Sequence, residues 1–315
     1  MRLNAMPSSE PTSHRDKKTT EREYDMHISI TGRLGSGKST VAGILRDKYG
    51  FEIYSTGTVQ RAMAAEMGLT TLEMNELMKN DVHFDHKIDD AVVRISEQRQ
   101  NDRLIFDSRM AWHFAKHSFR VFVTIDPQIA GNRCAIDRHG DVENYTSAED
   151  ASAQLLERSR LENLRFKEIY GVDNLDYSNY DLIVDSSVAD QYMVAELVYR
   201  EYLAYCYDPA AYGKKMYLAA QSIYPAETPE DAAAEAADGA PVPVFTVGGY
   251  HFAAQQYGRV LAGIRSREPF LPCRTVPVPE DAAASLAAFG EAILEDYERL
   301  GSFSYVSRPA VYRKK

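Results

Sequence analysis

A glycine-rich segment with one lysine and one hydroxyl residue is the part of the sequence best suited to binding phosphate. Residues 32–39, GRLGSGKS, match the spacing G-x-x-x-x-G-K-[ST] in full. Glycines let backbone N–H groups turn toward a phosphate, and a helix N-terminus after the loop adds its positive dipole end. A chance glycine-rich turn is the alternative, which the flanking strand and helix disfavour. The predicted triphosphate site comprises Gly32, Arg33, Leu34, Gly35, Ser36, Gly37, Lys38, Ser39 and Thr40.

A carboxylate near this loop could complete a metal site. The apolar run 103–107, RLIFD, ends in Asp107. An acidic residue at the tip of a strand beside such a loop can hold Mg²⁺ directly or through water, and the Ser39 hydroxyl can be a second ligand. The alternative is that Asp107 or Ser108 only caps the next helix. Both functions are compatible, and we expect Ser39 and Asp107 to organise the metal.

Several arginines could bind the remaining phosphate charge. Arg61 and Arg109 follow the second and third predicted strands, so they can pair bidentately with an acceptor phosphate. Arg158 and Arg165 are seven residues apart, which places both on one face of a helix. The alternative is a solvated surface paired with neighbouring glutamates. We expect four arginines to surround the transferring group from a lid, namely Arg133, Arg138, Arg158 and Arg165.

Alternating strands and helices must position these residues. Near-continuous apolar runs indicate parallel strands that are covered on both faces. The predicted strands are 26–31, 51–55, 103–107, 120–126 and 181–186. The predicted helices are 38–49, 58–67, 71–79, 85–98, 147–169 and 189–205. This order predicts a three-layer α/β P-loop domain with a parallel five-stranded sheet and a helical lid.

Composition and charge restrict the classes of partner. The 315 residues are 44% hydrophobic and 26% charged, with a formal net charge of -10. Such an acidic chain is not expected to bind nucleic acid or an anionic membrane. No apolar run is long enough to span a bilayer, and the N-terminal residues lack a signal-peptide apolar region. The three cysteines are scattered without metal-ligand spacing, which suits a reducing cytoplasm.

The chain divides by composition into three parts. Residues 1–24 are predicted to be a disordered extension, and residues 25–208 to form the P-loop domain. An Ala/Glu/Asp/Pro-rich stretch at 225–243 is typical of a linker or loop. Residues 209–315 are expected to comprise this linker and a small C-terminal α/β unit, with strands at 242–247 and 271–278 and helices at 250–265 and 280–299.

Residues 26–200 resemble the cytidylate kinases of the short, archaeal-like type. The resemblance rests on four motifs besides the phosphate loop. These are YSTGTVQRAMAAEMGLT (54–70), LIFDSR (104–109), ERSRLENLRFKEIYGVD (157–173) and LDYSNYDLIVDSS (175–187). The chain departs from the family at Ser108, where glycine is usual, and between the two lid arginines. The resemblance implies that Ser55, Gly57, Arg61 and Arg109 contact the acceptor.

The resemblance implies Mg²⁺-dependent transfer of a phosphoryl group from ATP to CMP or dCMP. A kinase for another monophosphate, or for a small acceptor such as shikimate or gluconate, is one alternative. A non-catalytic nucleotide sensor that controls the C-terminal unit is another. A GTPase is disfavoured because no [NT]KxD motif occurs in the expected region.

The C-terminal third carries a weaker signal. Residues 244–278 faintly resemble the strand–helix–strand core of ParB-like domains, although GGYHFAAQQYGR stands where those domains carry an Asp-Gly-x-x-Arg-type signature. We favour a structural or oligomerising role for this unit. Because every candidate chemical residue lies between Gly32 and Arg165, we predict that the segment 25–208 functions alone.

Overall fold

The computed structural model describes most of the chain between Met26 and Tyr312. The described ranges are 26–57, 64–69, 73, 83–137, 145–229, 240–300 and 305–312. The extension predicted for residues 1–24 and most of the two helices predicted between residues 58 and 79 lie outside them. Within the described part, no helix has both the length and the apolar character needed to cross a membrane.

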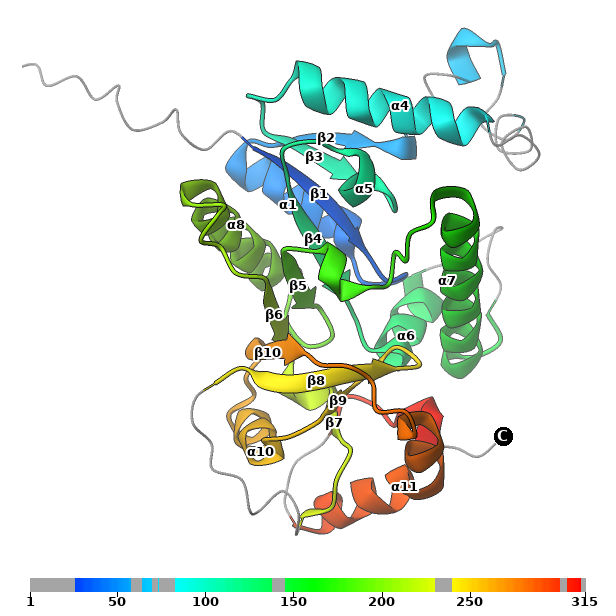
Figure 1. Cartoon of the computed structure of the whole chain (residues 1–315). Helices are drawn as coiled ribbons and strands as arrows, with labels where there is room; N and C mark the ends of the chain where they lie inside the picture. The colour runs from blue at the N-terminus through cyan, green and yellow to red at the C-terminus, as the bar shows by residue number, and fades with distance from the viewer. Residues whose placement is uncertain are drawn as a thin grey trace, which may run out of the picture.

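Five parallel strands form the half of the sheet that carries the phosphate loop (Figure 1). Their order is β2-β3-β1-β4-β5, and every neighbouring pair is parallel. The strands are β1 (His27–Gly32), β2 (Glu52–Ser55), β3 (Leu104–Asp107), β4 (Ser118–Thr124) and β5 (Leu182–Asp185). Each lies within two residues of its predicted range. The five predicted parallel strands are confirmed, and they form one half of a larger sheet.

Helices cover both faces of this half of the sheet, as the side chains of its strands require. Ile105 packs with the helices of one face, whereas its neighbours Leu104 and Phe106 pack on the opposite face. The first face is covered by α1 (Lys38–Tyr49) and α8 (Gln191–Tyr207), and the second by α4 (His83–Gln98) and α5 (Ala111–Phe114). The lid helix α7 (Ala148–Tyr170) packs on α6 (Pro127–Asp137) beside the sheet.

The C-terminal strands continue the same sheet. Among the described residues, all ten strands belong to one sheet, and its second half has the order β6-β10-β8-β9-β7. These strands are β6 (Lys215–Leu218), β7 (Ile223–Pro225), β8 (Val242–Val247), β9 (Tyr250–Ala253) and β10 (Leu271–Thr275). The strand β6 pairs in parallel with β5 and antiparallel with β10. The C-terminal unit thus has strands and helices, as expected, but its strands extend the sheet that carries the phosphate loop. Its domain boundary stays a prediction.

Helices and short 3₁₀ turns complete this half. The elements are α10 (Tyr257–Ser266), α11 (Ala282–Leu300), and 3₁₀ turns at Ala220–Ser222 and Ala310–Tyr312, while a further 3₁₀ turn at Tyr177–Asn179 precedes β5 in the first half. The prediction of a helix from residue 250 was wrong, because residues 250–253 form β9 and α10 begins at Tyr257. Gly248 and Gly249 have positive φ angles of 58° and 89°, so the chain reverses there into an antiparallel hairpin.

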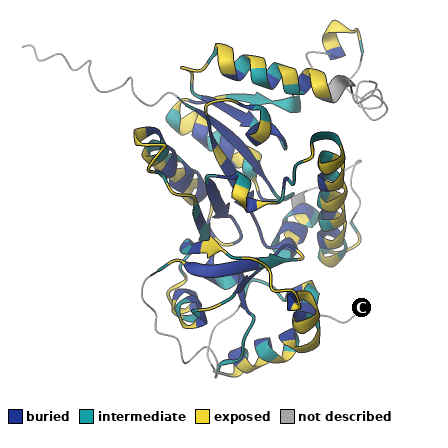
Figure 2. Cartoon of the chain, viewed as in Figure 1, coloured by how far each residue is buried: buried dark blue, intermediate teal, exposed yellow. Residues whose placement is uncertain are grey.

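Buried residues from both halves of the sheet pack together (Figure 2). Phe122 of β4 and Ile183 of β5 lie in one apolar cluster with Met216 and Leu218 of β6 and with residues of β8 and β10. The fully buried Asp185 accepts hydrogen bonds from the amide of Ala219, at 3.1 Å, and from the hydroxyl of Ser222. Polar and apolar contacts therefore both cross the boundary near residue 208.

Candidate active site

Three glycines shape the loop between β1 and α1. A Cβ atom on Gly32 would lie 2.3 Å from the carbonyl oxygen of Val123, so only glycine fits beside β4. Gly35 and Gly37 have φ angles of 77° and 75°, which L side chains rarely adopt. Gly37 is also the N-cap of α1, so the loop amides and the N-terminus of the helix lie together. This is the geometry that binds phosphate.

Side chains and backbone groups from neighbouring strands hold the loop in place. The amide of Arg33 donates to Val123 O at 3.0 Å, and the Ser186 hydroxyl donates to Ser36 O at 2.9 Å. Ser186 follows β5, so this contact fastens the loop to the next strand end along the sheet. The loop is therefore preorganised by the fold.

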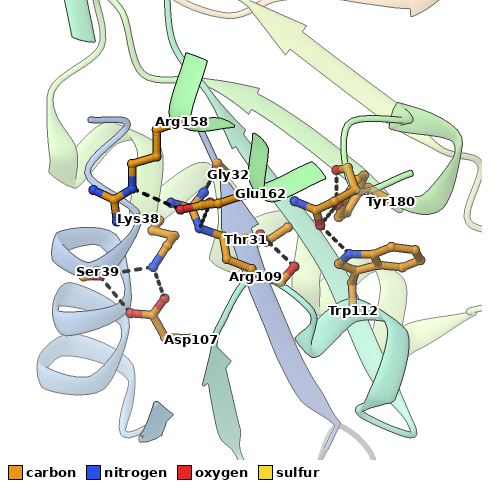
Figure 3. Close-up of polar contacts among 11 residues, drawn as sticks. Thr31, Gly32, Lys38, Ser39, Asp107, Arg109, Trp112, Arg158, Glu162 and Tyr180 are labelled. Atoms are coloured by element: carbon orange, nitrogen blue, oxygen red, sulfur yellow. Dashed lines mark hydrogen bonds and ion pairs between the residues drawn. The ribbon is translucent and has the colours of Figure 1, made fainter. Parts of the chain in front are cut away.

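Lys38, Ser39 and Asp107 form the polar centre of the site (Figure 3). The Lys38 ammonium forms an ion pair with one carboxylate oxygen of Asp107. The Ser39 hydroxyl donates to the other carboxylate oxygen at 2.8 Å. The Lys38 and Asp107 side chains retain only 21% and 9% of their exposure. A cation, a hydroxyl and a shielded carboxylate thus meet at the mouth of the phosphate loop.

Two arginines converge on Glu162 of the lid helix (Figure 3). The Arg158 Nε atom lies 3.1 Å from Glu162 Oε1, and the Arg109 Nε atom lies 3.4 Å from Glu162 Oε2. Arg109 also donates to Gly32 O at 2.7 Å, which places its guanidinium beside the loop. Burial lowers the pKa of Arg109, and Glu162 opposes this shift. One anionic group therefore contacts both arginines next to the phosphate loop.

A buried polar cluster fixes the C-terminal end of the lid helix near Arg109. The Trp112 indole donates to Asn174 Oδ1 at 2.7 Å, and the Tyr180 hydroxyl donates to the same oxygen at 3.1 Å. The backbone amide of Asn174 in turn donates to Asn163 Oδ1 on α7 at 2.8 Å. The segment after the lid helix is thus tied to α5, which follows Arg109 in the chain.

A cleft of about 860 Å³ opens over the loop. Its far wall comes from the segment between β5 and α8 and from α6, where Arg133 Nη2 donates to Ser186 O at 2.6 Å. The volume suits a nucleotide-sized ligand, since ligand sites span roughly 300–1,000 Å³. Besides the loop, the cleft is lined by Arg133, Cys134, Ser186, Ala189, Asp190, Gln191, Tyr192 and Val194.

The other predicted site residues occupy different places. Ser55 pairs in register with Asp107 at the same end of the sheet, and Gly57 follows two residues later. Arg165 lies on the exposed surface of α7, and Thr40 is exposed on α1. Their chemical roles stay predictions. Arg61 and Arg138 lie outside the described residues.

Two features of the site were missed in the sequence. Glu162 was interpreted only as part of a charged helix surface, although its spacing of four from Arg158 was a usable signal. The cleft wall at residues 186–192 carries no chemical motif, and only the proximity of parallel strand ends could have indicated it.

The donor set near Asp107 fits a magnesium ion. Carboxylate and hydroxyl oxygens are hard ligands, and Mg²⁺ in phosphoryl-transfer sites is held by one or two such groups together with substrate phosphates. Within the described ranges, no cluster of three or more His, Cys, Asp or Glu residues has the geometry of a metal cage. Asp107 and Ser39 are two oxygen ligands that this arrangement offers to such an ion.

Comparison with known proteins identifies relatives of the first half of the chain. Residues 27–188 match the model of the cytidylate kinase-like family. The chain is 33% identical over 173 residues to the cytidylate kinase of Methanococcoides burtonii, which covers 55% of this chain and 94% of that protein. It is 36% identical over 164 residues to the cytidylate kinase of Natronomonas pharaonis, which covers 51% of this chain and 81% of that protein.

A third relative carries the same region within a longer protein. The chain is 31% identical over 176 residues to the S-adenosylmethionine-dependent nucleotide dehydratase of Lacinutrix mariniflava. That match covers 56% of this chain and 35% of the dehydratase. The family match in this chain ends at residue 188, before β6 begins.

Proposed function

The chain belongs to the cytidylate kinase-like family, and we propose that it transfers the γ-phosphoryl group of ATP to CMP or dCMP. One observation carries the proposal. Lys38, Ser39, Asp107 and Arg109 meet at the carboxyl end of the parallel strands, around a loop shaped for phosphate. The named cytidylate kinases among the relatives support the choice of acceptor.

The phosphate loop would bind and orient the donor. Its amides and the N-terminus of α1 surround the β-phosphate, while Lys38 leaves Asp107 and reaches the β- and γ-phosphates. The attacking phosphate oxygen of the acceptor forms a bond to the γ-phosphorus as the bond to the bridging β–γ oxygen breaks. A monophosphate is already ionised near neutral pH, so no strong general base is needed. Positioning and charge neutralisation supply most of the catalysis.

Asp107 and Ser39 would hold Mg²⁺ when the nucleotide binds. The ion supplies charge neutralisation at the phosphate oxygens. The 2.8 Å hydrogen bond from Ser39 Oγ to Asp107 Oδ2 supports the assignment, because it brings the two oxygens close enough to bind one ion. The side chain of Asp107 is largely shielded from water, which strengthens its interaction with a cation.

Arginines would bind the acceptor phosphate and close over the transferring group. Arg109 lies beside Gly32, at the end of the sheet where β2 ends at Ser55 and Gly57 follows, so it can hold the acceptor phosphate with Arg61. Arg158 would exchange Glu162 for the γ-phosphoryl group as the lid closes. Arg133, Arg138 and Arg165 are proposed to add charge from the lid side, and closing arginines can contribute roughly 10³–10⁵ in rate.

A screen of acceptors tests the proposed substrate. We expect CMP and dCMP to give the highest kcat/KM when ADP release is measured with all ribo- and deoxyribonucleoside monophosphates. A preference for AMP, GMP or UMP would refute the cytidylate assignment and leave the kinase class intact. ADP release that does not depend on any monophosphate would contradict the kinase class as well.

Substitution of Asp107 tests the metal assignment. Asp107→Asn keeps the size of the side chain but removes its charge, so we expect kcat to fall about 10²-fold and the Mg²⁺ requirement to rise. Titration of initial rates with Mg²⁺ at saturating ATP measures both effects. The control is Asp102→Asn, two residues before β3 begins. The Asp102 carboxylate is exposed and forms a surface ion pair with Arg99. Equal Mg²⁺ requirements in the two variants would remove Asp107 from the metal site.

A further inference from the structure

The turn between β8 and β9 reaches from the C-terminal half of the sheet to the active site. Figure 1 shows the end of β8 beside α6, on the side of the molecule that carries α7. The turn consists of Gly248 and Gly249, both with positive φ angles. Neither residue is part of the predicted chemistry, and both lie beyond the family match, which ends at residue 188.

Gly249 touches three elements of the kinase half at once. A Cβ atom at this position would lie 3.1 Å from Arg33 Nη1, 3.1 Å from Pro127 Cγ and 3.2 Å from Leu156 Cδ2. Arg33 belongs to the phosphate loop, Pro127 begins α6, and Leu156 lies on the lid helix, two residues before Arg158. The backbone of the turn therefore sits in the corner where the loop and the lid helix meet.

Packing holds Arg33 in that corner. Its Nε atom is buried and has no hydrogen-bond partner among the described residues. The side chain borders the nucleotide cleft on one side and, on the other, a small apolar gap lined by Leu34, Leu155 and Leu156. The position of Arg33 thus depends on the surfaces around it, and Gly249 is one of them.

Buried polar contacts connect β9, which follows the turn, to β4 and β8. His251 of β9 lies 3.3 Å from Thr124 Oγ1 at the end of β4 and 3.0 Å from Thr246 Oγ1 of β8. Burial, with a smaller contribution from the charge of Arg33, lowers the pKa of His251 to about 3, so the ring is neutral and does not add a second charge. Asp126, which follows β4, accepts hydrogen bonds from Tyr224 at 2.8 Å and Ser307 at 2.9 Å.

From these contacts we propose that Gly249 of the β8–β9 turn is a positioning residue for nucleotide binding. It sets the place of Arg33, and with it the phosphate loop, against the lid helix at Leu156. The C-terminal strands thereby contribute to ATP affinity without touching the nucleotide. The inference rests on the proposed function only in taking ATP as the ligand of the loop.

Two neighbouring glycines supply a matched test. Gly249→Ala pushes a methyl group against Arg33 and Leu156, so we expect the dissociation constant for ATP to rise about tenfold, because small displacements of phosphate-binding groups are costly. Gly248→Ala also places alanine at a positive φ, but its methyl group would meet Val311 Cγ1 at 2.6 Å, within the C-terminal half. We expect this control to lose thermal stability while the dissociation constant stays within about twofold of the parent value.

The measurement is direct binding of a fluorescent ATP analogue by the full chain, displaced by ATP, with the melting temperature determined in parallel. The titration is run well below the melting temperatures of all variants, where nearly all of the protein is folded, so a loss of stability does not raise the apparent dissociation constant. Equal dissociation constants for Gly249→Ala and Gly248→Ala would overturn the proposal. Because no acceptor is needed, the result stands even if no monophosphate is phosphorylated.

A second pair of variants is used if Gly249→Ala does not fold. Leu156→Ala removes the side chain of the lid helix that packs against Gly249, whereas Leu161→Ala removes a leucine of the same helix that is 52% exposed. If packing in this corner positions the loop, Leu156→Ala should bind ATP about tenfold more weakly than the parent, and Leu161→Ala within about twofold of it. Equal dissociation constants for these two variants would mean that the corner does not position the loop, and the proposal would be wrong.

Discussion

Lys38→Ala is expected to abolish detectable phosphoryl transfer in a protein that remains folded. Lys38 is the one lysine of the phosphate loop. Its loss removes a positive charge that neutralises the transferring phosphoryl group, which we expect to lower kcat by roughly 10³-fold. Its contacts in the structure are with Ser39 and Asp107 at the edge of the cleft, outside the apolar core. The measurement is monophosphate-dependent ADP release, with folding checked by circular dichroism.

Lys48→Ala on the same helix is the matched control. The Lys48 side chain is 53% exposed and lies 3.9 Å from Glu196, so its removal should change neither folding nor turnover. Comparable turnover in folded Lys38→Ala and Lys48→Ala would take the phosphate loop out of the mechanism.

A chain that ends at residue 208 is expected to be insoluble or inactive. The sequence alone led us to predict that segment 25–208 functions independently, but the contacts across this boundary favour the opposite result. Removing β6 exposes the edge of β5 and uncovers Phe122 and Ile183, and exposed strand edges promote aggregation.

Truncation also leaves a buried carboxylate without its partners. Asp185 is fully buried, and burial raises its pKa, while hydrogen bonds from Ser187, Ser222 and Ala219 oppose the shift. The last two partners would be lost, which costs up to about 1–3 kcal/mol for the carboxylate where water does not replace them, against a typical total stability of about 5–15 kcal/mol. We therefore expect loss of the folded state.

Expression of residues 25–208 beside the full chain, followed by gel filtration and circular dichroism, measures this effect. Adding Asp185→Asn to the truncated chain separates the two causes, because it removes the buried charge and leaves the strand edge exposed. A soluble, monomeric segment 25–208 with the full specific activity would contradict our account of the C-terminal strands and restore the independent domain.

Local signals predicted the centre of the site well. The loop GRLGSGKS and the helix from Lys38 to Tyr49 are encoded in one continuous stretch, so spacing alone located them. The contact of Lys38 with Asp107 joins residues that are 69 apart in the chain. Parallel strands have their carboxyl ends at one edge of the sheet, so the proximity of Asp107 to the phosphate loop could be predicted.

Long-range pairing in the C-terminal half could not be predicted in the same way. The strand β6 has four residues, and its antiparallel partner β10 is separated from it by β7, β8, β9 and α10, so no local pattern indicates this pairing. The Gly248–Gly249 turn was not predicted, because the sequence that follows it was interpreted as a helix. Its contact with Arg33 depends on how the two halves of the sheet are joined, which is a property of the folded chain.

Transfer of a labelled γ-phosphoryl group tests the central claim most directly. The full-length protein is incubated with ATP labelled at the γ-phosphate, Mg²⁺ and CMP, and the products are separated by chromatography. Our account predicts that the label appears in the β-phosphate of CDP, in step with ADP formation, and that Lys38→Ala forms no labelled CDP. Label found only in free phosphate, or ATP bound without transfer to CMP, would contradict it.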